Sequence, residues 1–286
     1  MQGVIDREWI VKKTLFVLAM LTVLGIILIV FFVARESVPA FREAGPANLF
    51  GADWNPKEGQ YGMLIFIVGT LTTTVGGLLL GTPLAIGSAL FLTQMAPRRV
   101  RSVATRGIEI LAGIPSIVLG WLGLTVLVPW LRTLTQSTGT GILAASIILA
   151  IMIIPTIATI SKDALEAVPP SYKEASLAMG ATRWQTIRRV LLPAAKPGII
   201  VAVILGMGRA IGETMAVALV IGPSTAFPTS LWSPTHTMTT KILIEMGEST
   251  GVQRSSLFAM GLVLLLLSMV LIVMVRLVTR ERKAER

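Results

Sequence analysis

Two opposite charges stand four residues apart inside one of the longest apolar stretches of the sequence. Arg209 and Glu213 are the only charged residues between positions 198 and 221. On a continuous helix this spacing places both side chains on one face. A charge near the middle of a bilayer costs about 2.5–3.5 kcal/mol on insertion scales. The two residues must therefore pair with each other, face the interior of a helix bundle, or line a water-filled path.

The chemistry of this pair suits an anion. The Arg209 guanidinium stays charged and offers a planar fork of donors that matches the geometry of an oxyanion. The carboxylate of Glu213 can neutralise Arg209 when the path is empty. It can also accept a hydrogen bond from a protonated oxyanion such as hydrogen phosphate, which fully ionised sulfate cannot donate. The structural alternative is a neutral pair that fixes this helix to a neighbour, and close helix packing explains Gly206, Gly208 and Gly212 better than a substrate role does.

Six uncharged apolar stretches predict membrane-spanning helices around this pair. The chain has 286 residues, of which 53% are hydrophobic and 14% are charged, whereas a soluble domain carries about 25% charged residues. Each stretch can cross about 30 Å of hydrocarbon, and each must be helical because lipid offers the backbone no hydrogen-bond partner. The fold class is therefore an all-α polytopic membrane protein. The predicted spans are residues 14–34, 63–93, 110–131, 139–160, 198–221 and 256–275.

Prolines in the second and third spans bear on the predicted helices and on the path. The second is longer than one crossing needs, and we expect it to be tilted or broken near Gly81, Thr82 and Pro83. The third contains Pro115, directly before Ser116. The hydroxyl of Ser116 can donate to a solute or relieve the carbonyl that the proline leaves without a partner. Thr70 in the second span can likewise hydrate a path, although threonine in a membrane helix more often bonds its own backbone.

Basic residues indicate the orientation of the chain. If both termini are cytoplasmic, the inner segments hold most of the 25 Lys and Arg residues, about three times as many as the outer segments, as the positive-inside rule expects. The outer loops at residues 35–61 and 222–254 are either docking surfaces or connectors with aromatic interface anchors. The predicted organisation is a cytoplasmic N-terminus (1–13), a first transmembrane helix (14–34), an extracytoplasmic loop (35–61), a core (62–278) and a cytoplasmic C-terminus (279–286).

Several classes of function are disfavoured. The chain has no cysteine and a single histidine, His236, to which we assign no role. We therefore predict no metal site and no catalytic residue. The sequence has no GxxxxGK[ST] phosphate loop, so this chain does not hydrolyse ATP by that route and needs no cofactor of its own. An intramembrane enzyme would need a nucleophile and a base at helical spacing within the spans, and no such pair is present.

The cytoplasmic segment 161–197 predicts a helical hairpin. Two pairs have the spacing of a capping box, in which side chains cap the start of a helix, and Gly180 between them suits the position just past a helix end. We expect prolines to bound the two helices. The capping pairs are Ser171 with Glu174 and Thr182 with Gln185, and the prolines are Pro169, Pro170, Pro193 and Pro197.

The first helix of the hairpin has a small apolar surface, which suits docking into a groove on another protein. The alternative is an amphipathic helix that lies on lipid headgroups, with basic side chains at the phosphates. The apolar surface comprises Ala175, Leu177, Ala178 and Met179, and the basic side chains are Arg183, Arg188 and Arg189.

A family resemblance favours the docking interpretation. The order Glu174, Ala175, Ser176, then Gly180, then Val190-x-Leu192-Pro193 resembles the EAA signature of ATP-binding-cassette (ABC) importer permeases, with matching spacing throughout. Ser176 replaces the second Ala and Val190 replaces Ile. The resemblance implies a type I importer permease fold. It also implies that the hairpin is a coupling helix, in which Glu174, Ala175, Ser176, Gly180, Leu192 and Pro193 contact a separate ATPase that binds ATP and Mg.

Further strings resemble the phosphate-specific importers, and within them the PstC permeases more than their PstA paralogues. This resemblance implies an inorganic phosphate importer in the bacterial inner membrane. It further implies a heterodimer with a PstA-like permease, two copies of an ATPase subunit and an extracytoplasmic phosphate-binding protein, with Arg209 and Glu213 on charged positions linked to transport. The strings are Trp54-Asn55-Pro56, Gly69-Thr70-Leu71 and the segments 109–116 and 208–216.

Two other functions remain open. The first is the same machine with another oxyanion, such as sulfate or molybdate. The second is an ion-coupled secondary transporter, which would leave the hairpin motif without a role.

Overall fold

The computed structural model of the protein describes residues 2–284, and within this range it describes all side chains except those of residues 2–8, 10 and 278–284. Most of the two predicted cytoplasmic termini therefore lies outside the described side chains. Within the described residues, six helical segments are long and apolar enough to cross a membrane, which confirms the all-α polytopic prediction. They are Val11–Glu43, Leu64–Met95, Ser116–Thr135, Ile142–Glu166, Arg183–Gly212 and Gly251–Leu277.

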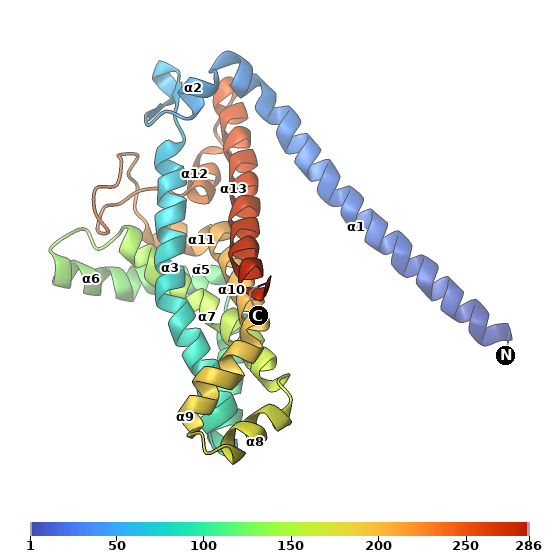
Figure 1. Ribbon diagram of the computed structural model, residues 1–286. Coiled ribbons are helices and arrows are strands. Elements are labelled where there is room, and N and C mark those ends of the chain that lie inside the picture. Colours follow the sequence, from blue (N-terminus) through green and yellow to red (C-terminus); the bar gives the residue numbers. More distant parts are fainter. Residues whose placement is uncertain (1, 285–286) are drawn as a thin grey trace.

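The helices follow one another with little strand structure between them (Figure 1). The α-helices are α1 (Gln2–Glu43), α2 (Pro46–Leu49), α3 (Leu64–Leu90), α4 (Arg98–Gly113), α5 (Ser116–Leu122), α6 (Val128–Thr135), α7 (Ile142–Glu166), α8 (Pro170–Ala178), α9 (Arg183–Thr186), α10 (Leu192–Gly212), α11 (Met215–Val220), α12 (Met238–Glu245) and α13 (Gly251–Ala284). The π-helical segments are η2 (Phe91–Met95), η3 (Gly123–Leu127) and η4 (Ile187–Leu191). A two-stranded hairpin pairs β1 (Trp54–Asn55) with β2 (Gln60–Tyr61), joined by the 3₁₀ turn η1 (Pro56–Glu58).

Figure 1 shows α3, α7 and α10 in the body of the molecule, with the α8–α9 hairpin at one end and α2 at the other. The helix α1 leaves the body at the α2 end and extends away from it. Near that end it packs on α13, where the rings of Phe32 and Phe258 meet edge to face at 5.8 Å. From Val11 to Ile29 the apolar side chains of α1 are exposed, as a lipid-facing or partner-facing helix requires.

Glycines on α3 let it pack closely on α7. A Cβ added to Gly77 would lie 2.9 Å from the Cβ of Leu149, and one added to Gly81 would lie 2.9 Å from Cγ1 of Ile153. Gly81 therefore serves helix packing. The expected break near Gly81 is wrong, because α3 runs through Pro83 to Leu90 and continues as η2.

The third predicted span, residues 110–131, is not one helix. The helix α4 ends at Gly113, and Ile114 and Pro115 are extended, with ψ angles of 128° and 136°. Proline disfavours helical geometry in the residue before it, so the chain turns here and the spanning helix starts at Ser116. The residues of α4 are exposed or half-buried, and its first turns carry Arg98, Arg99 and Arg101.

The predicted helical hairpin is present, with two corrections. The box of Thr182 and Gln185 is confirmed, since each side chain bonds the other residue's backbone N–H. The box of Ser171 and Glu174 is wrong, because α8 starts with Pro170 in its first turn, where the missing N–H costs nothing. Nor do Pro193 and Pro197 end the unit. Helical structure runs unbroken from Arg183 through η4 to Gly212.

Candidate solute path and coupling surface

The predicted span 198–221 breaks beside its charged pair. The helix α10 ends at Gly212, Glu213 is extended with a ψ of 127°, and α11 starts at Met215. The expectation that Arg209 and Glu213 share one helix face is therefore wrong. No ion pair forms between these two described side chains.

The Arg209 side chain is half-buried in the last turn of α10. Its Nη1 donates to the hydroxyl of Thr156 on α7, at 3.2 Å. Thr156 is neutral, so within the part of the chain that the structure describes the positive charge is not cancelled, and most of the five guanidinium donors have no protein acceptor. There is space beside it, because a Cβ added to Gly208 or Gly212 would meet no atom within 4 Å.

Glu213 supports the start of α11. Its Oε1 accepts a hydrogen bond from the Ala216 backbone N–H at 3.1 Å, and its own carbonyl accepts one from the Thr239 hydroxyl at 3.0 Å. The Thr214 hydroxyl donates to the Gly212 carbonyl at 3.2 Å. These bonds satisfy backbone groups that the break exposes, as a break at membrane depth requires.

A second broken helix meets this one. The helix α5 packs against α11 so closely that a Cβ on Gly120 would lie 2.6 Å from the Cα of Ala216. Ser116 lies one helical turn before Gly120, about 6 Å along the axis. Within the described residues its hydroxyl has no hydrogen-bond partner, so it does not relieve a carbonyl freed by Pro115. Discontinuous helices that face each other are typical of solute sites in transporters.

Thr70 makes structural contacts rather than facing open space. Its side chain is 2% exposed, its hydroxyl donates to the Phe66 carbonyl at 2.8 Å, and it accepts the Met238 backbone N–H at 3.0 Å. The intrahelical bond is the one that threonine in a membrane helix favours. Thr70 therefore joins α3 to α12, and its hydroxyl has little capacity left for a solute.

Sequence reasoning missed a buried charged cluster on α12. Lys241, expected in an outer loop, is 4% exposed, forms an ion pair with Glu245, and lies 5.3 Å from the ring centroids of both Trp54 and Phe66. The other oxygen of Glu245 accepts from Trp54 Nε1 and from Gln253 Nε2, each at 3.1 Å. The signal in the sequence was the four-residue spacing of Lys241 and Glu245, which suits a helix.

The same cluster explains the state of His236. Burial, and after it the nearby Lys241 charge, lower the pKa of His236 from 6.5 to about 4, against the opposing effect of Glu245. The imidazole is therefore neutral near pH 7 and packs against the Phe66 ring. Trp54 is buried in the same core, so it is neither an exposed docking residue nor an interface anchor.

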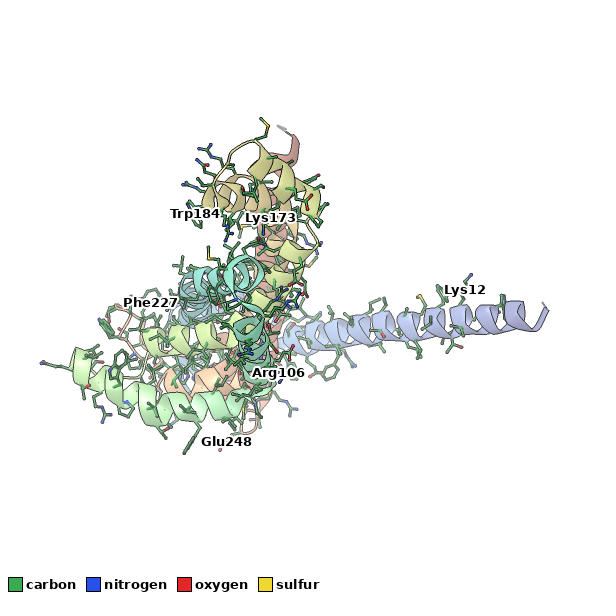
Figure 2. The ribbon with its side chains drawn as sticks, turned by 90° about the horizontal axis from the view of Figure 1, so that it is seen from below. Lys12, Arg106, Lys173, Trp184, Phe227 and Glu248 are labelled. Atoms are coloured by element: carbon green, nitrogen blue, oxygen red, sulfur yellow. The ribbon has the colours of Figure 1, made fainter. Side chains whose placement is uncertain are left out.

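The α8–α9 hairpin presents an exposed apolar surface. Met179 is 88% exposed at its tip, and Gly180 turns the chain there with a φ of +80°. Lys173 and Trp184, labelled in Figure 2, lie together on the hairpin and far from Lys12 on α1. The other large apolar residues exposed on the hairpin are Tyr172, Leu177 and Trp184.

The EAA-like residues divide into exposed and supporting positions. Glu174 and Ala175 are exposed on α8, and the Ser176 hydroxyl bonds that of Thr186 at 2.9 Å, which joins the two arms of the hairpin. Leu192 and Pro193 are half-buried at the start of α10, where Leu192 packs on the core between α3 and α7.

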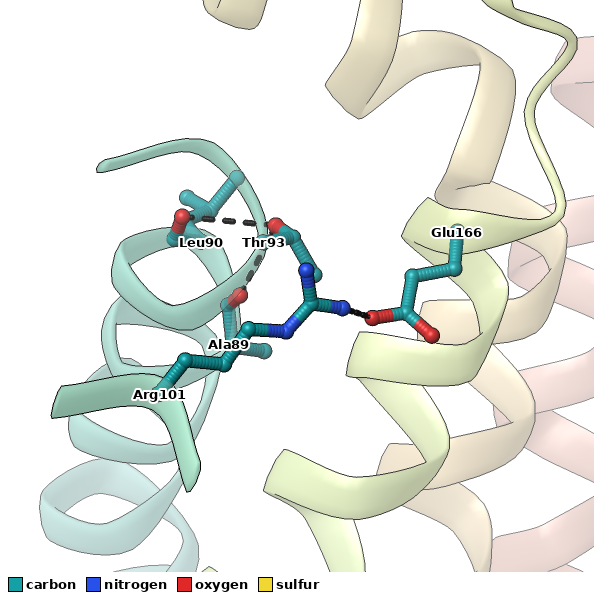
Figure 3. Close-up of polar contacts among 5 residues, drawn as sticks. All are labelled: Ala89, Leu90, Thr93, Arg101 and Glu166. Carbon is teal, nitrogen blue, oxygen red and sulfur yellow. Dashed lines mark hydrogen bonds and ion pairs between the residues drawn. The ribbon is translucent and has the colours of Figure 1, made fainter. Parts of the chain in front are cut away.

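Two polar contacts attach the hairpin end of the molecule to the body. Lys173 Nζ donates to Oε1 of Gln94, at 3.0 Å. Arg101 on α4 forms an ion pair with Glu166 at the end of α7, directly before the hairpin (Figure 3).

Comparison with known proteins identifies the family. Residues 81–283 match the family described as "Binding-protein-dependent transport system inner membrane component". The chain belongs to this permease family. The permease is 42% identical to the probable ABC transporter permease YqgH of Bacillus subtilis, over 93% of this chain and 88% of that one. It is 36% identical to the phosphate transport system permease PstC of Haemophilus influenzae, over 95% and 94% of the two chains.

Solved structures agree on the fold of the permease. A chain of a bacterial ABC transporter for the import of alginate has a TM-score of 0.68 at 19% identity, with 97% of each chain covered. A chain of the MetNI methionine ABC transporter in an inward-facing conformation has a TM-score of 0.54 at 25% identity, covering 76% of this chain and 94% of that one. The permease thus has the type I ABC importer fold and is a multi-pass inner-membrane transport subunit. Such a subunit works with an ATPase and a periplasmic binding protein.

Proposed function

We propose that this permease is the membrane subunit of an ATP-driven inorganic phosphate importer. It forms part of the translocation path and couples that path to a separate ATPase. The observation that carries the proposal is Arg209, a half-buried guanidinium at a helix break whose one partner among the described side chains is the neutral Thr156. The similarity to PstC proteins over nearly the full chain supports phosphate as the solute.

The complex we propose contains this subunit, a PstA-like permease, two ATPase subunits that bind ATP and Mg, and an extracytoplasmic phosphate-binding protein. ATP hydrolysis takes place in the partner ATPase. The hairpin and both termini face the cytoplasm, in agreement with the distribution of basic residues. The exposed apolar tip at Leu177 and Met179 docks into a groove of the ATPase.

One continuous helical segment connects the ATPase contact to the solute site. Residues Arg183 to Gly212 run from the hairpin to the break without interruption of helical structure. Movement of the hairpin when the ATPases close therefore displaces the end of α10 and Arg209 with it. In this scheme the ATPases switch access to the path by favouring one of two arrangements of the broken helices.

Arg209, Glu213 and Ser116 divide the recognition of phosphate. Arg209 supplies charge-assisted donors, and Ser116 supplies a free hydroxyl. The carboxylate of Glu213 accepts a hydrogen bond from the protonated oxygen of hydrogen phosphate, which fully ionised sulfate cannot donate. Its second oxygen serves this role while Oε1 holds the Ala216 N–H.

The test is uptake of labelled phosphate and labelled sulfate into proteoliposomes that contain the assembled complex and internal ATP. We expect ATP-dependent uptake of phosphate in excess of sulfate, and a smaller preference in Glu213→Gln. Uptake of sulfate without phosphate would replace the proposed solute by another oxyanion. Uptake that is driven by an ion gradient and needs no ATP would overturn the importer mechanism itself.

A further inference from the structure

The short helix α12 contacts both the β1–β2 hairpin and the break between α10 and α11. Its last residue, Glu245, accepts a hydrogen bond from the indole N–H of Trp54 on β1. Near its start, the hydroxyl of Thr239 donates to the backbone carbonyl of Glu213 at 3.0 Å. One eight-residue helix thus joins two regions that are far apart in the sequence.

The position of α12 is tightly determined. A capping box between Thr237 and Thr240 fixes its first turn, and the Met238 N–H bonds the Thr70 hydroxyl on α3. A Cβ on Gly69 would collide with the backbone carbonyl of His236, so α3 and the segment before α12 are in direct backbone contact. Met238, Thr239, Thr240 and Lys241 are all buried. We therefore expect α12 to move only as a rigid unit together with the residues that it contacts.

The bond from Thr239 falls on a sensitive point of the backbone. Glu213 is the extended residue between α10 and α11, and its carbonyl is not part of a regular helical hydrogen-bond ladder. The orientation of this peptide sets the direction in which α11 leaves the end of α10, and hence how the Glu213 side chain and α11 lie relative to Arg209. A side chain that holds the Glu213 carbonyl therefore acts on the solute site without touching the solute.

We propose that Thr239 is a positioning residue for the Arg209 site. We further propose that α12 couples the β1–β2 hairpin, at Trp54, to the break between α10 and α11. A movement of the β1–β2 hairpin displaces Glu245 through its bond to Trp54, and α12 transmits that displacement to the Glu213 carbonyl. The inference rests on the proposed function for its role in transport. Its physical content, a mechanical link between Trp54 and the break, holds for any solute.

A cysteine reporter at the break tests this link. The chain has no native cysteine, and Gly212 has open space for a side chain, so Gly212→Cys provides one thiol in this subunit. The assembled complex in proteoliposomes is treated with a small charged thiol reagent, and modification is read from the mass of this subunit. We add Thr239→Val, which keeps the shape of the residue and removes its donor. The matched control is Thr133→Val, whose hydroxyl bonds only the carbonyl of Trp130 in its own helix.

We expect Thr239→Val to raise the modification rate of the reporter about two- to tenfold, the range set by the loss of one hydrogen bond. Thr239→Ser should restore the parent rate, because it retains the donor, and Thr133→Val should leave it unchanged. Trp54→Phe, which removes only the indole N–H from the Glu245 contact, should raise the rate by a smaller factor. A parent-like rate in Thr239→Val or in Trp54→Phe would overturn the proposal. Labelling requires no phosphate, so a failure of phosphate uptake would overturn the proposed solute and leave this result intact.

Discussion

Two acid–base pairs in this permease have the same spacing and opposite outcomes. Lys241 and Glu245, four residues apart on α12, form a buried ion pair. Arg209 and Glu213 are also four residues apart, yet they do not pair, because α10 ends between them at Gly212. The spacing rule for helical ion pairs holds only while the helix continues. The break separates two charges that an unbroken helix would have neutralised.

The two pairs therefore have different roles, one in stability and one in anion binding. The Lys241 charge is cancelled by Glu245 and covered by the rings of Trp54 and Phe66. This pair therefore stabilises the core around Trp54, Phe66 and α12. The Arg209 charge keeps a neutral partner and free donors, so it remains available to an anion. The predictions below test this division, from the largest expected effect to the smallest.

Removal of one member of the buried pair should have the largest effect on stability. Glu245→Leu leaves the Lys241 ammonium buried without its counter-charge, which costs about 3–5 kcal/mol. The double variant Lys241→Met/Glu245→Leu removes both charges and should be considerably more stable than the single variant. Thermal midpoints of the purified complex measure both. Equal midpoints for the single and double variants would show that the ion pair is not what stabilises this core.

The pH dependence of stability should report the same cluster. The pKa of His236 is lowered from 6.5 to about 4 in the folded protein, mainly by burial. The unfolded chain therefore binds a proton that the folded chain does not, and stability falls as the pH drops from about 6.5 towards 4. The loss is on the order of 3 kcal/mol over the whole window.

The control for this dependence is His236→Gln, which cannot titrate. Its stability should change less with pH between about 6.5 and 4 than that of the parent complex, when midpoints are compared at each pH. Parallel curves for the two proteins would contradict the assignment of this dependence to His236.

The contact between α3 and the segment before α12 should tolerate no added methyl group. Gly69→Ala places a Cβ against the carbonyl of His236, a backbone atom that cannot turn aside. Overpacking of this kind costs about 1–3 kcal/mol. Gly208→Ala, where the same Cβ meets open space, should be near neutral for the stability of this subunit. Similar midpoints for the two variants would remove the argument that α12 is rigidly held.

The sequence was informative where local rules decide the structure. The spans followed from uncharged length, the turn at Gly180 from its position after an apolar helix, and the second capping box from Thr182 and Gln185. It was not informative where tertiary contacts decide. Nothing local distinguishes Pro83, which α3 passes through, from Pro115, before which α4 has already ended.

The two charged pairs make the same point. The sequence predicts that Arg209 and Glu213 share one helix face and that Lys241 lies in an outer loop. The break at Glu213 is supported by a contact from Thr239, 26 positions later, and the burial of Lys241 depends on Trp54, 187 positions earlier. Such contacts bring together distant segments and have no signature at either end.

An exposed ion pair should make the smallest contribution to stability among the pairs compared. Arg101 and Glu166 pair near the hairpin with side chains 41% and 38% exposed. Arg101→Ala should therefore lower stability by less than about 1 kcal/mol, since water solvates the remaining carboxylate. A loss as large as that of Glu245→Leu, measured by the same thermal midpoint, would show that burial does not govern the energetics of these pairs.

The most direct test compares Arg209→Gln with Lys241→Met in uptake per assembled complex. If Arg209 binds the solute, Arg209→Gln should lower ATP-dependent phosphate uptake about 10- to 100-fold, the factor for lost charged hydrogen bonds, while assembly and thermal midpoint stay close to the parent values. Lys241→Met should show the reverse balance, with a larger loss of assembly than of uptake from each complex that forms. Phosphate uptake that survives Arg209→Gln, together with a loss of stability, would contradict the account and make Arg209 a structural residue.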